Sequence, residues 1–267
     1  MTDPDQALRA LIEHRTGPLK ALTATEHGYG SDVTALAEGD AGTTFVKAMR
    51  NRAGGRRDSL LREIAIAPYL TALAPPLKWA ETGDEHRWIV GGWEAVEGRP
   101  ADMRPGSADL ERVVEVLSRA SDLPVPPVAK DWTEQRWDRF APEEDIHALR
   151  GRALLYTDWH PNNLILGTDE SWLVDWSWPT VGAAYISPAL LVVQLVSGGH
   201  EPPRAEAIVT PCPAWHEAPQ AAIDTFARAH ARMCQAAAER RPGQAWLTAV
   251  ARAATTWAAH RIDRRHR

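Results

Sequence analysis

The alternation of apolar and polar positions predicts β-strands in the first part of the chain. The stretches "DVTALAEG" (32–39) and "TTFVKAM" (43–49) have the residue types of two strands, and the "GDAG" that joins them is a turn signal. The stretch "HRWIVGGWEAV" (86–96) predicts a further strand, which the polar "EGRP" ends. Apolar runs flank a polar loop in "LLYTDWHPNNLIL" (154–166), and "WLVDW" (172–176) predicts one more strand.

Apolar residues at helical spacing predict helices in four places. Residues 5–15 predict a short amphipathic helix, and residues 58–70, "DSLLREIAIAPYL", a second one that Pro68 should kink or shorten. The segment 107–121 has one clear apolar face. The remainder, from about 187 to 267, is rich in Ala and Arg and is expected to be mostly helical.

This order, with strands early and helices late, predicts an α+β fold of two unequal parts. We place the N-terminal part at residues 1–96 and the C-terminal part at residues 97–267. The chain has 267 residues, of which 44% are hydrophobic and 24% charged, which suits one large domain or two lobes.

Charge, hydropathy and cysteine content argue against nucleic acid and membrane as partners and indicate the cellular compartment. The formal net charge of -5 argues against nucleic acid as a partner. The longest uncharged stretch is 176–199, but its dense apolar part, 186–196, is too short to cross a bilayer, so we expect no membrane partner. Cys212 and Cys234 lack a metal-type spacing, and so few cysteines favour a reducing cytoplasm. We also expect a monomer.

A lysine inside an apolar strand is the first candidate for chemistry. Lys47 lies in "FVKAM", where burying its charge is costly unless the charge is paired. Glu63 follows on an otherwise apolar helix face and is a candidate partner. The alternatives are a lysine on an edge strand that reaches solvent and an exposed helical glutamate.

Three oxygen-bearing side chains on neighbouring loops are the second candidate. Asp158 and Asn163 lie in the polar loop between two apolar runs, and Asp175 lies in "WLVDW". Each alone reads as a turn residue. Together they supply a base and two hard ligands, which Mg²⁺-nucleotide chemistry requires.

Phosphoryl transfer needs the phosphates held, their charge neutralised and the attacking hydroxyl aligned. In that chemistry Lys47 would hold the α- and β-phosphates, and Glu63 would hold Lys47. Asn163 and Asp175 would bind Mg²⁺, and Asp158 would accept the proton of the hydroxyl.

The order of these residues is that of the protein-kinase signature, G-x-G, Lys, Glu, Asp-x4-Asn, Asp. Gly28 and Gly30 in "GYGSDV" would belong to the phosphate-covering loop, but a third glycine is missing and this part is weak. The Asp-x4-Asn followed by a strand-borne Asp is the specific part, because order, spacing and apolar flanks all agree.

The stretch "TDWHPNNLIL" followed by "WLVDWSWPTVGAAYISPALL" resembles the aminoglycoside phosphotransferase family of the kinase-like superfamily. The matching positions are Asp158, His160, Pro161, Asn163, Asp175, Trp176 and Pro188. The resemblance implies a bilobal protein-kinase-like fold, with a small β-rich N-lobe and a larger helical C-lobe. It also implies that ATP or GTP binds between the lobes, where Glu94 and Val96 of the hinge would present backbone groups to the purine.

Three positions depart from the family pattern. The usual His-Gly before the base is Tyr156-Thr157, and a further acid after Asp-Trp is Ser177. The Asp-Pro that opens the next helix is Ser187-Pro188. Ser suits an N-cap and Pro the first helical position, but an Asp that would brace the catalytic loop is missing.

The resemblance implies a kinase that phosphorylates a hydroxyl of a small molecule, with an antibiotic such as an aminoglycoside as the leading acceptor. A metabolic kinase of a sugar or an amino alcohol is one alternative. A nucleotide-binding pseudokinase is another, motivated by Tyr156-Thr157 and Ser177. Residues 201–267 hold ten Arg against four Glu and two Asp, which is mild evidence against a strongly cationic acceptor.

Overall fold

The computed structural model describes residues 6–25 and 30–264, and the chain divides into two compact units. The N-terminal unit contains the described residues up to Arg99 together with Ile165–Trp178. The C-terminal unit contains Pro100–Leu164 and the described residues from Pro179 onward. The segment 165–178, which the sequence analysis assigned to the C-terminal part, therefore clusters with the N-terminal strands.

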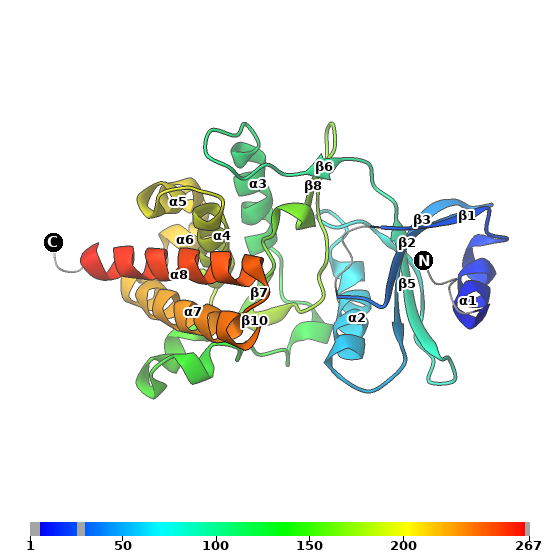
Figure 1. The fold of residues 1–267 in the computed structure, drawn as a ribbon, viewed down its shortest axis with the longest axis horizontal. Helices are drawn as coiled ribbons and strands as arrows, with labels where there is room; N and C mark the ends of the chain where they lie inside the picture. Colours follow the sequence, from blue (N-terminus) through cyan, green and yellow to red (C-terminus); the bar gives the residue numbers. More distant parts are fainter. Residues whose placement is uncertain (1–5, 26–29, 265–267) are drawn as a thin grey trace. The chain divides into compact units, whose positions relative to one another are not determined.

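A five-stranded antiparallel sheet forms the centre of the N-terminal unit (Figure 1). The predicted hairpin is present, with β2 and β3 joined at Gly39 and Gly42, and Gly42 has the positive φ of 92° that this tight turn requires. Two strands of this sheet, β1 and β4, were not predicted from the sequence, and both are short and half-exposed. In sheet order the strands are β1 (Ala21–Ala24), β2 (Val33–Gly39), β3 (Gly42–Arg50), β5 (Trp88–Glu94) and β4 (Leu77–Glu81).

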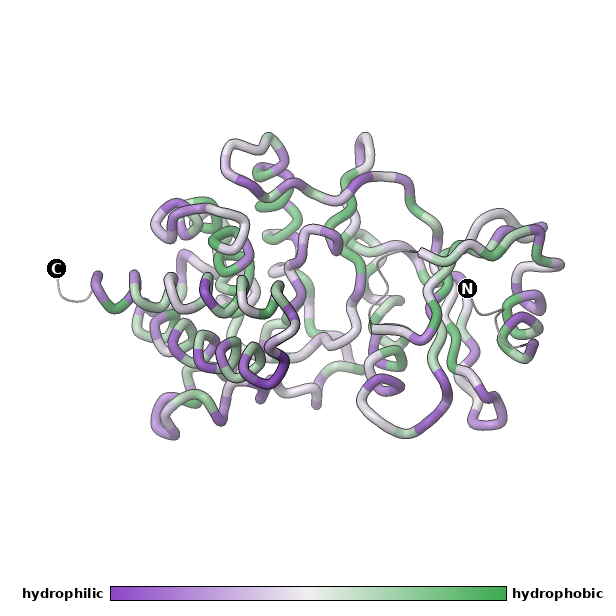
Figure 2. The backbone as a smooth tube through the Cα atoms, viewed as in Figure 1, coloured by the Kyte–Doolittle hydropathy of each residue, from purple (hydrophilic) through white to green (hydrophobic). Residues whose placement is uncertain are grey.

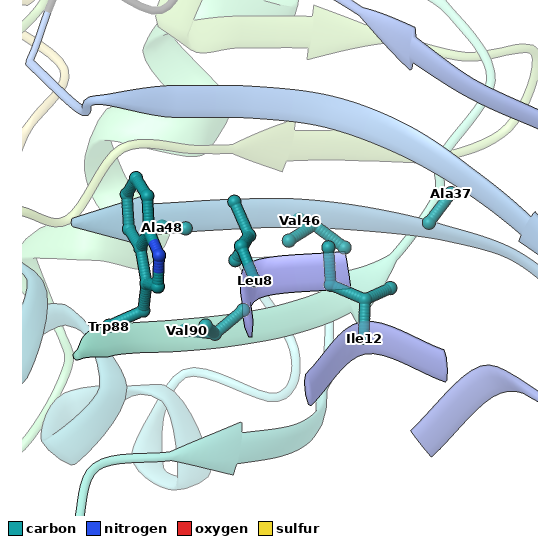
Figure 3. Close-up of a cluster of buried hydrophobic side chains, with 7 residues drawn as sticks. All are labelled: Leu8, Ile12, Ala37, Val46, Ala48, Trp88 and Val90. Atoms are coloured by element: carbon teal, nitrogen blue, oxygen red, sulfur yellow. The ribbon is translucent and has the colours of Figure 1, made fainter. Parts of the chain in front are cut away.

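Helix α1 (Gln6–Thr16) covers one face of this sheet. Its residues Leu8 and Ile12 are fully buried against side chains from β2, β3 and β5 (Figure 3). Those side chains are Ala37, Val46, Ala48, Trp88 and Val90. Because side chains alternate along a strand, the residue between Val46 and Ala48 points to the opposite face of the sheet.

Helix α2 (Gly55–Ile66) lies on that opposite face, where its Leu60 packs against Met49, Ile89 and Trp93. The helix stops at Ile66 and continues as a 3₁₀ turn (Ala67–Tyr69), so the predicted shortening at Pro68 is confirmed. Lys47 lies between Val46 and Ala48 and therefore faces α2.

The segment 165–178 contributes β9 (Ser171–Leu173) and most of β8 (Leu164–Leu166). With β6 (Arg99–Pro100) these strands form a small sheet in the order β6-β8-β9. The backbone N–H of Leu173 donates to the carbonyl of Leu73 over 2.8 Å. The predicted strand at 172–176 is wrong beyond Leu173, because Asp175 has φ 59° and cannot continue an extended strand.

The C-terminal unit is mostly helical, as its sequence predicts. Helix α4 is buried along nearly all of its length and is coloured as hydrophobic in Figure 2, and it packs against α5 and α8. Its helices are α3 (Leu110–Ser121), α4 (Ile186–Ser197), α5 (Pro202–Val209), α6 (Pro213–His216), α7 (Gln220–Arg240) and α8 (Ala245–Arg264). Its paired strands are β7 (Ala153–Leu155) and β10 (Thr180–Gly182), and its 3₁₀ turns are Pro127–Ala129, Asp138–Phe140, Glu143–Leu149 and Pro161–Asn163.

Within the described residues, every helix is too short or too polar to cross a membrane.

A buried histidine joins α7 to the segment that precedes β7. The indole N–H of Trp137 donates to Nδ1 of His230 over 3.0 Å, and Phe226 stacks on the imidazole at 5.4 Å. Burial, together with the nearby charge of Arg136, lowers the pKa of His230 to about 4. His230 is therefore neutral in the folded protein at neutral pH.

This neutral histidine predicts a loss of stability in mild acid. The unfolded chain takes up a proton at His230 below about pH 6.5, whereas the folded chain does so only near pH 4. The stabilisation is complete above pH 6.5, and about 2 kcal/mol of it should be lost by pH 5. Urea denaturation of wild type and His230→Asn at pH 7 and pH 5 measures this loss. An equal pH dependence in both proteins would contradict the assignment.

Candidate active site

Lys47 pairs with two carboxylates in the N-terminal unit. Its Nζ donates to Glu63 Oε1 over 2.7 Å and to Asp175 Oδ1 over 3.0 Å. Lys47 and Glu63 are 9% and 7% exposed, so neither side chain reaches solvent freely. The structure thus brings together three of the predicted site residues, and the alternatives of a solvated lysine and an exposed helical glutamate are wrong.

The strands next to Lys47 make room for this ion pair. Lys47 lies opposite Gly91 of β5, and the ring of Trp93 occupies the space above that glycine. A Cβ at Gly91 would lie 2.4 Å from the Trp93 ring, so any larger residue would displace it. The Lys47 ammonium lies 6.0 Å from the centre of the same ring.

The Lys47 ammonium attracts both carboxylates of this triad, whereas the two carboxylates repel each other. Burial alone would lower the pKa of Lys47, but the carboxylates of Glu63 and Asp175 outweigh it and raise the pKa well above its usual value. Burial would raise the pKa of Asp175, yet Lys47 and the Ser177 hydroxyl lower it overall. Burial has the largest effect on Glu63 and raises its pKa against the attraction of Lys47. At neutral pH the ammonium and the Asp175 carboxylate are both charged.

The backbone at Asp175 has an unusual conformation. Asp175 is the one non-glycine residue with a positive φ among the described residues. The neighbouring Trp176 is 3% exposed and its indole N–H donates to the Leu173 carbonyl over 2.9 Å, which fixes the turn. Ser177 donates its hydroxyl to Asp175 Oδ1. Lys47 and Ser177 therefore engage the same oxygen, and Oδ2 is the oxygen that remains for a cation.

The predicted nucleotide-contacting backbone is described in part. Gly28 lies outside the described residues. Gly30 is exposed, and its carbonyl accepts from Arg56 Nε over 3.3 Å. Glu94 is the last residue of β5, and its N–H donates to the Pro76 carbonyl over 2.9 Å. Val96 lies half-buried in the irregular segment that follows.

The loop that contains Asp158 belongs to the C-terminal unit and follows β7. Asp158 is exposed, and its backbone carbonyl accepts from the His160 N–H over 2.7 Å and from Asn163 Nδ2 over 3.1 Å. Because the amide nitrogen of Asn163 is used in this way, its Oδ1 is the atom that remains for a ligand. His160 Nδ1 accepts from the Asn162 N–H, so this histidine structures the loop.

Aromatic packing and one serine hold the start of this loop. Tyr156 and Trp159 are both buried and meet edge to face, with their ring centres 5.3 Å apart. Ser187 Oγ donates to the Tyr156 carbonyl over 3.0 Å. The predicted N-cap role of Ser187 is wrong, because α4 begins at Ile186 with Tyr185 at the cap. Ser187 instead holds the start of the Asp158 loop through the Tyr156 carbonyl, and this contact was not predicted from the sequence.

Arg136 was not predicted from the sequence as a residue of this site, and its guanidinium donates to Thr157 beside Asp158. The motif that contains Asp158 gives no signal for a partner this far away in sequence.

Removing the Lys47 charge should destabilise the N-terminal unit. Lys47→Met leaves the buried Glu63 without its cation, and breaking a buried ion pair costs about 3 kcal/mol. Lys47→Met/Glu63→Leu removes both charges and should recover much of this loss. Urea denaturation of the three proteins gives the free energies of unfolding. If Lys47→Met were as stable as wild type, the Lys47–Glu63 ion pair would not contribute to stability as described.

Solved structures with the same fold include several phosphotransferases. Choline kinase LicA from Streptococcus pneumoniae aligns with a TM-score of 0.64 at 11% identity, covering 95% of this chain and 99% of that one. A spectinomycin phosphotransferase in complex with ADP and spectinomycin aligns with a TM-score of 0.60 at 11% identity, covering 93% of each chain. A thermostable mutant of aminoglycoside phosphotransferase APH(4)-Ia with ADP and hygromycin B aligns at 0.56 and 12% identity, covering 95% and 99%.

No family model and no curated protein matches the sequence. At this level of identity the structural likeness establishes the fold. The chain therefore has the α+β, kinase-like fold of the aminoglycoside phosphotransferases and choline kinase, which is the fold that its sequence motif implied.

Proposed function

We propose that the protein is an O-phosphotransferase that moves the γ-phosphate of ATP or GTP to a hydroxyl of a small molecule. The observation that carries this proposal is the ion-paired triad of the buried Lys47 and Glu63 with the half-exposed Asp175, in a chain with a phosphotransferase fold. Two of the aligned structures contain ADP, which supports nucleotide binding.

Lys47 would hold the α- and β-phosphates. Its ammonium is already oriented by Glu63, so binding phosphate requires little further ordering of the side chain. Glu63 itself remains behind the lysine, buried on α2.

Asn163 and Asp175 would bind Mg²⁺. The described residues include no group of three or more His, Cys, Asp or Glu that could hold a metal. Mg²⁺ usually takes one or two carboxylates and completes its shell with water and phosphate oxygens. The remaining oxygens, Asn163 Oδ1 and Asp175 Oδ2, are hard donors of the right kind. The ion would neutralise charge on the transferred phosphate.

Asp158 would act as the base. Its side chain is exposed, while its backbone carbonyl is fixed by His160 and Asn163. A carboxylate on a backbone held in this way would accept the proton of an acceptor hydroxyl and orient the oxygen for attack on phosphorus.

The acceptor class stays open between two candidates. The aligned structures include complexes with spectinomycin and hygromycin B, which favours an antibiotic, and choline kinase, which favours an amino alcohol. Two buried carboxylates of the C-terminal helices, Glu206 and Asp224, are both paired with Arg261 at 2.9 and 2.6 Å, and Glu206 is also paired with Arg264 at 2.7 Å. These carboxylates are therefore already neutralised, which weakens the case for a polycationic acceptor.

A panel of acceptors tests the proposal. Aminoglycosides, spectinomycin, macrolides, sugars, choline and homoserine are each incubated with Mg-ATP or Mg-GTP and followed by mass spectrometry. We expect one compound to gain the mass of a phosphate. Asp158→Asn should lower the rate by about 10²-fold or more while nucleotide affinity is retained. The higher kcat/KM between antibiotic and metabolite decides the acceptor class.

Two outcomes would contradict the proposal. Nucleotide binding without any turnover would favour a pseudokinase. Turnover that is equal in wild type and Asp158→Asn would remove Asp158 from the mechanism.

A further inference from the structure

A buried carboxylate anchors an arginine close to the loop of Asp158. Glu134 is 1% exposed, and its carboxylate accepts from Nε of Arg136 at 2.9 Å and from the Thr180 hydroxyl at 2.6 Å. It also accepts from the backbone N–H of Arg136 at 2.6 Å. Burial alone would raise the pKa of Glu134, but the charge and hydrogen bonds of Arg136 outweigh it and lower the pKa. Glu134 is therefore ionised and holds Arg136 in one orientation.

The backbone around Glu134 is fixed by its pairing with β10. The Glu134 N–H donates to the Val181 carbonyl over 2.8 Å, and the Val181 N–H donates to the Trp132 carbonyl over 2.7 Å. Strand β10 pairs in turn with β7, which leads directly into Tyr156 and Thr157. The anchor and the loop therefore belong to one hydrogen-bonded framework within the C-terminal unit.

Arg136 extends from this anchor to the residue before Asp158. Its Nη1 donates to Thr157 Oγ1 over 2.9 Å, and its Nη2 donates to Thr180 Oγ1 over 3.2 Å. The arginine side chain is 38% exposed, but its charge is compensated by Glu134 and most of its N–H groups are used. This favours a brace over a binding site for an anion.

We propose that Arg136 is a positioning residue that sets the place of Asp158 through the Thr157 hydroxyl. The family that the motif resembles has glycine where this chain has Thr157, and glycine offers no hydroxyl to hold. In this chain the Thr157 hydroxyl accepts a charge-assisted hydrogen bond from Arg136. The proposal rests on the proposed function, because it concerns the base of that reaction.

Two substitutions at Thr157 test the brace without disturbing Glu134. Thr157→Val removes the hydroxyl at nearly constant volume, whereas Thr157→Ser keeps it. Arg136→Met is less suitable, because it would leave a buried carboxylate unpaired. Arg104→Met is the matched control, since it breaks an exposed arginine–aspartate pair elsewhere in the same unit.

Amide hydrogen exchange and phosphoryl-transfer kinetics are measured on wild type, Thr157→Val, Thr157→Ser and Arg104→Met. We expect Thr157→Val to speed amide exchange in residues 156–163 alone, and to lower kcat by about tenfold or more with KM for nucleotide unchanged, as small misplacements of catalytic groups do. Thr157→Ser and Arg104→Met should match wild type in both measurements.

The outcomes separate the brace from the proposed function. Faster exchange in Thr157→Val but unchanged kcat would overturn the positioning role. Identical exchange in Thr157→Val and Thr157→Ser would overturn the brace itself. If wild type phosphorylates no acceptor, the proposed function fails, while the exchange difference still supports the brace.

Discussion

The N-terminal unit depends on one constraint, which is that the buried ammonium of Lys47 must be paired. An unpaired buried charge costs several kcal/mol, and the two nearby carboxylates remove that cost. They come from α2 and from the segment 165–178, so three separate stretches of chain must meet at one point. This explains why a segment distant in sequence clusters with the N-terminal strands.

In the proposed function, the same pairing would orient the Lys47 ammonium for phosphate. The Lys47 ammonium has three N–H donors, and Glu63 and Asp175 accept from it. A donor therefore remains for a phosphate oxygen. The left-handed backbone of Asp175 belongs to this arrangement, because it occurs at the residue whose carboxylate accepts from Lys47. Sparsely populated backbone conformations often mark functional residues, and this one occurs at a predicted metal ligand.

The loop of Asp158 is held by different means. Its own backbone accepts the Asn163 amide, Ser187 holds the Tyr156 carbonyl, and Arg136 reaches Thr157. Each departure from the family pattern in this loop has thereby acquired a contact. Changed residues at these positions are therefore compatible with an ordered base, which weakens the pseudokinase alternative.

Part of this account could be predicted from the sequence. A lysine in an apolar strand and a glutamate on an apolar helix face indicated the candidate pair that the structure contains, and the order and spacing of the motif predicted Asp158, Asn163 and Asp175 as site residues. It could not predict β1 and β4, since short half-exposed strands depend on their neighbours for pairing. It could not predict Arg136 or the role of Ser187 either, because these contacts join residues whose proximity arises only from the fold.

Calorimetric titration of nucleotide tests the central claim most directly, since it requires no knowledge of the acceptor. ATP is titrated into wild type and Asp175→Asn, with magnesium present and with magnesium removed by EDTA. The account predicts that wild type binds Mg-ATP more tightly than metal-free ATP and that Asp175→Asn loses this difference. Magnesium-independent binding, or no nucleotide binding to wild type at all, would contradict it.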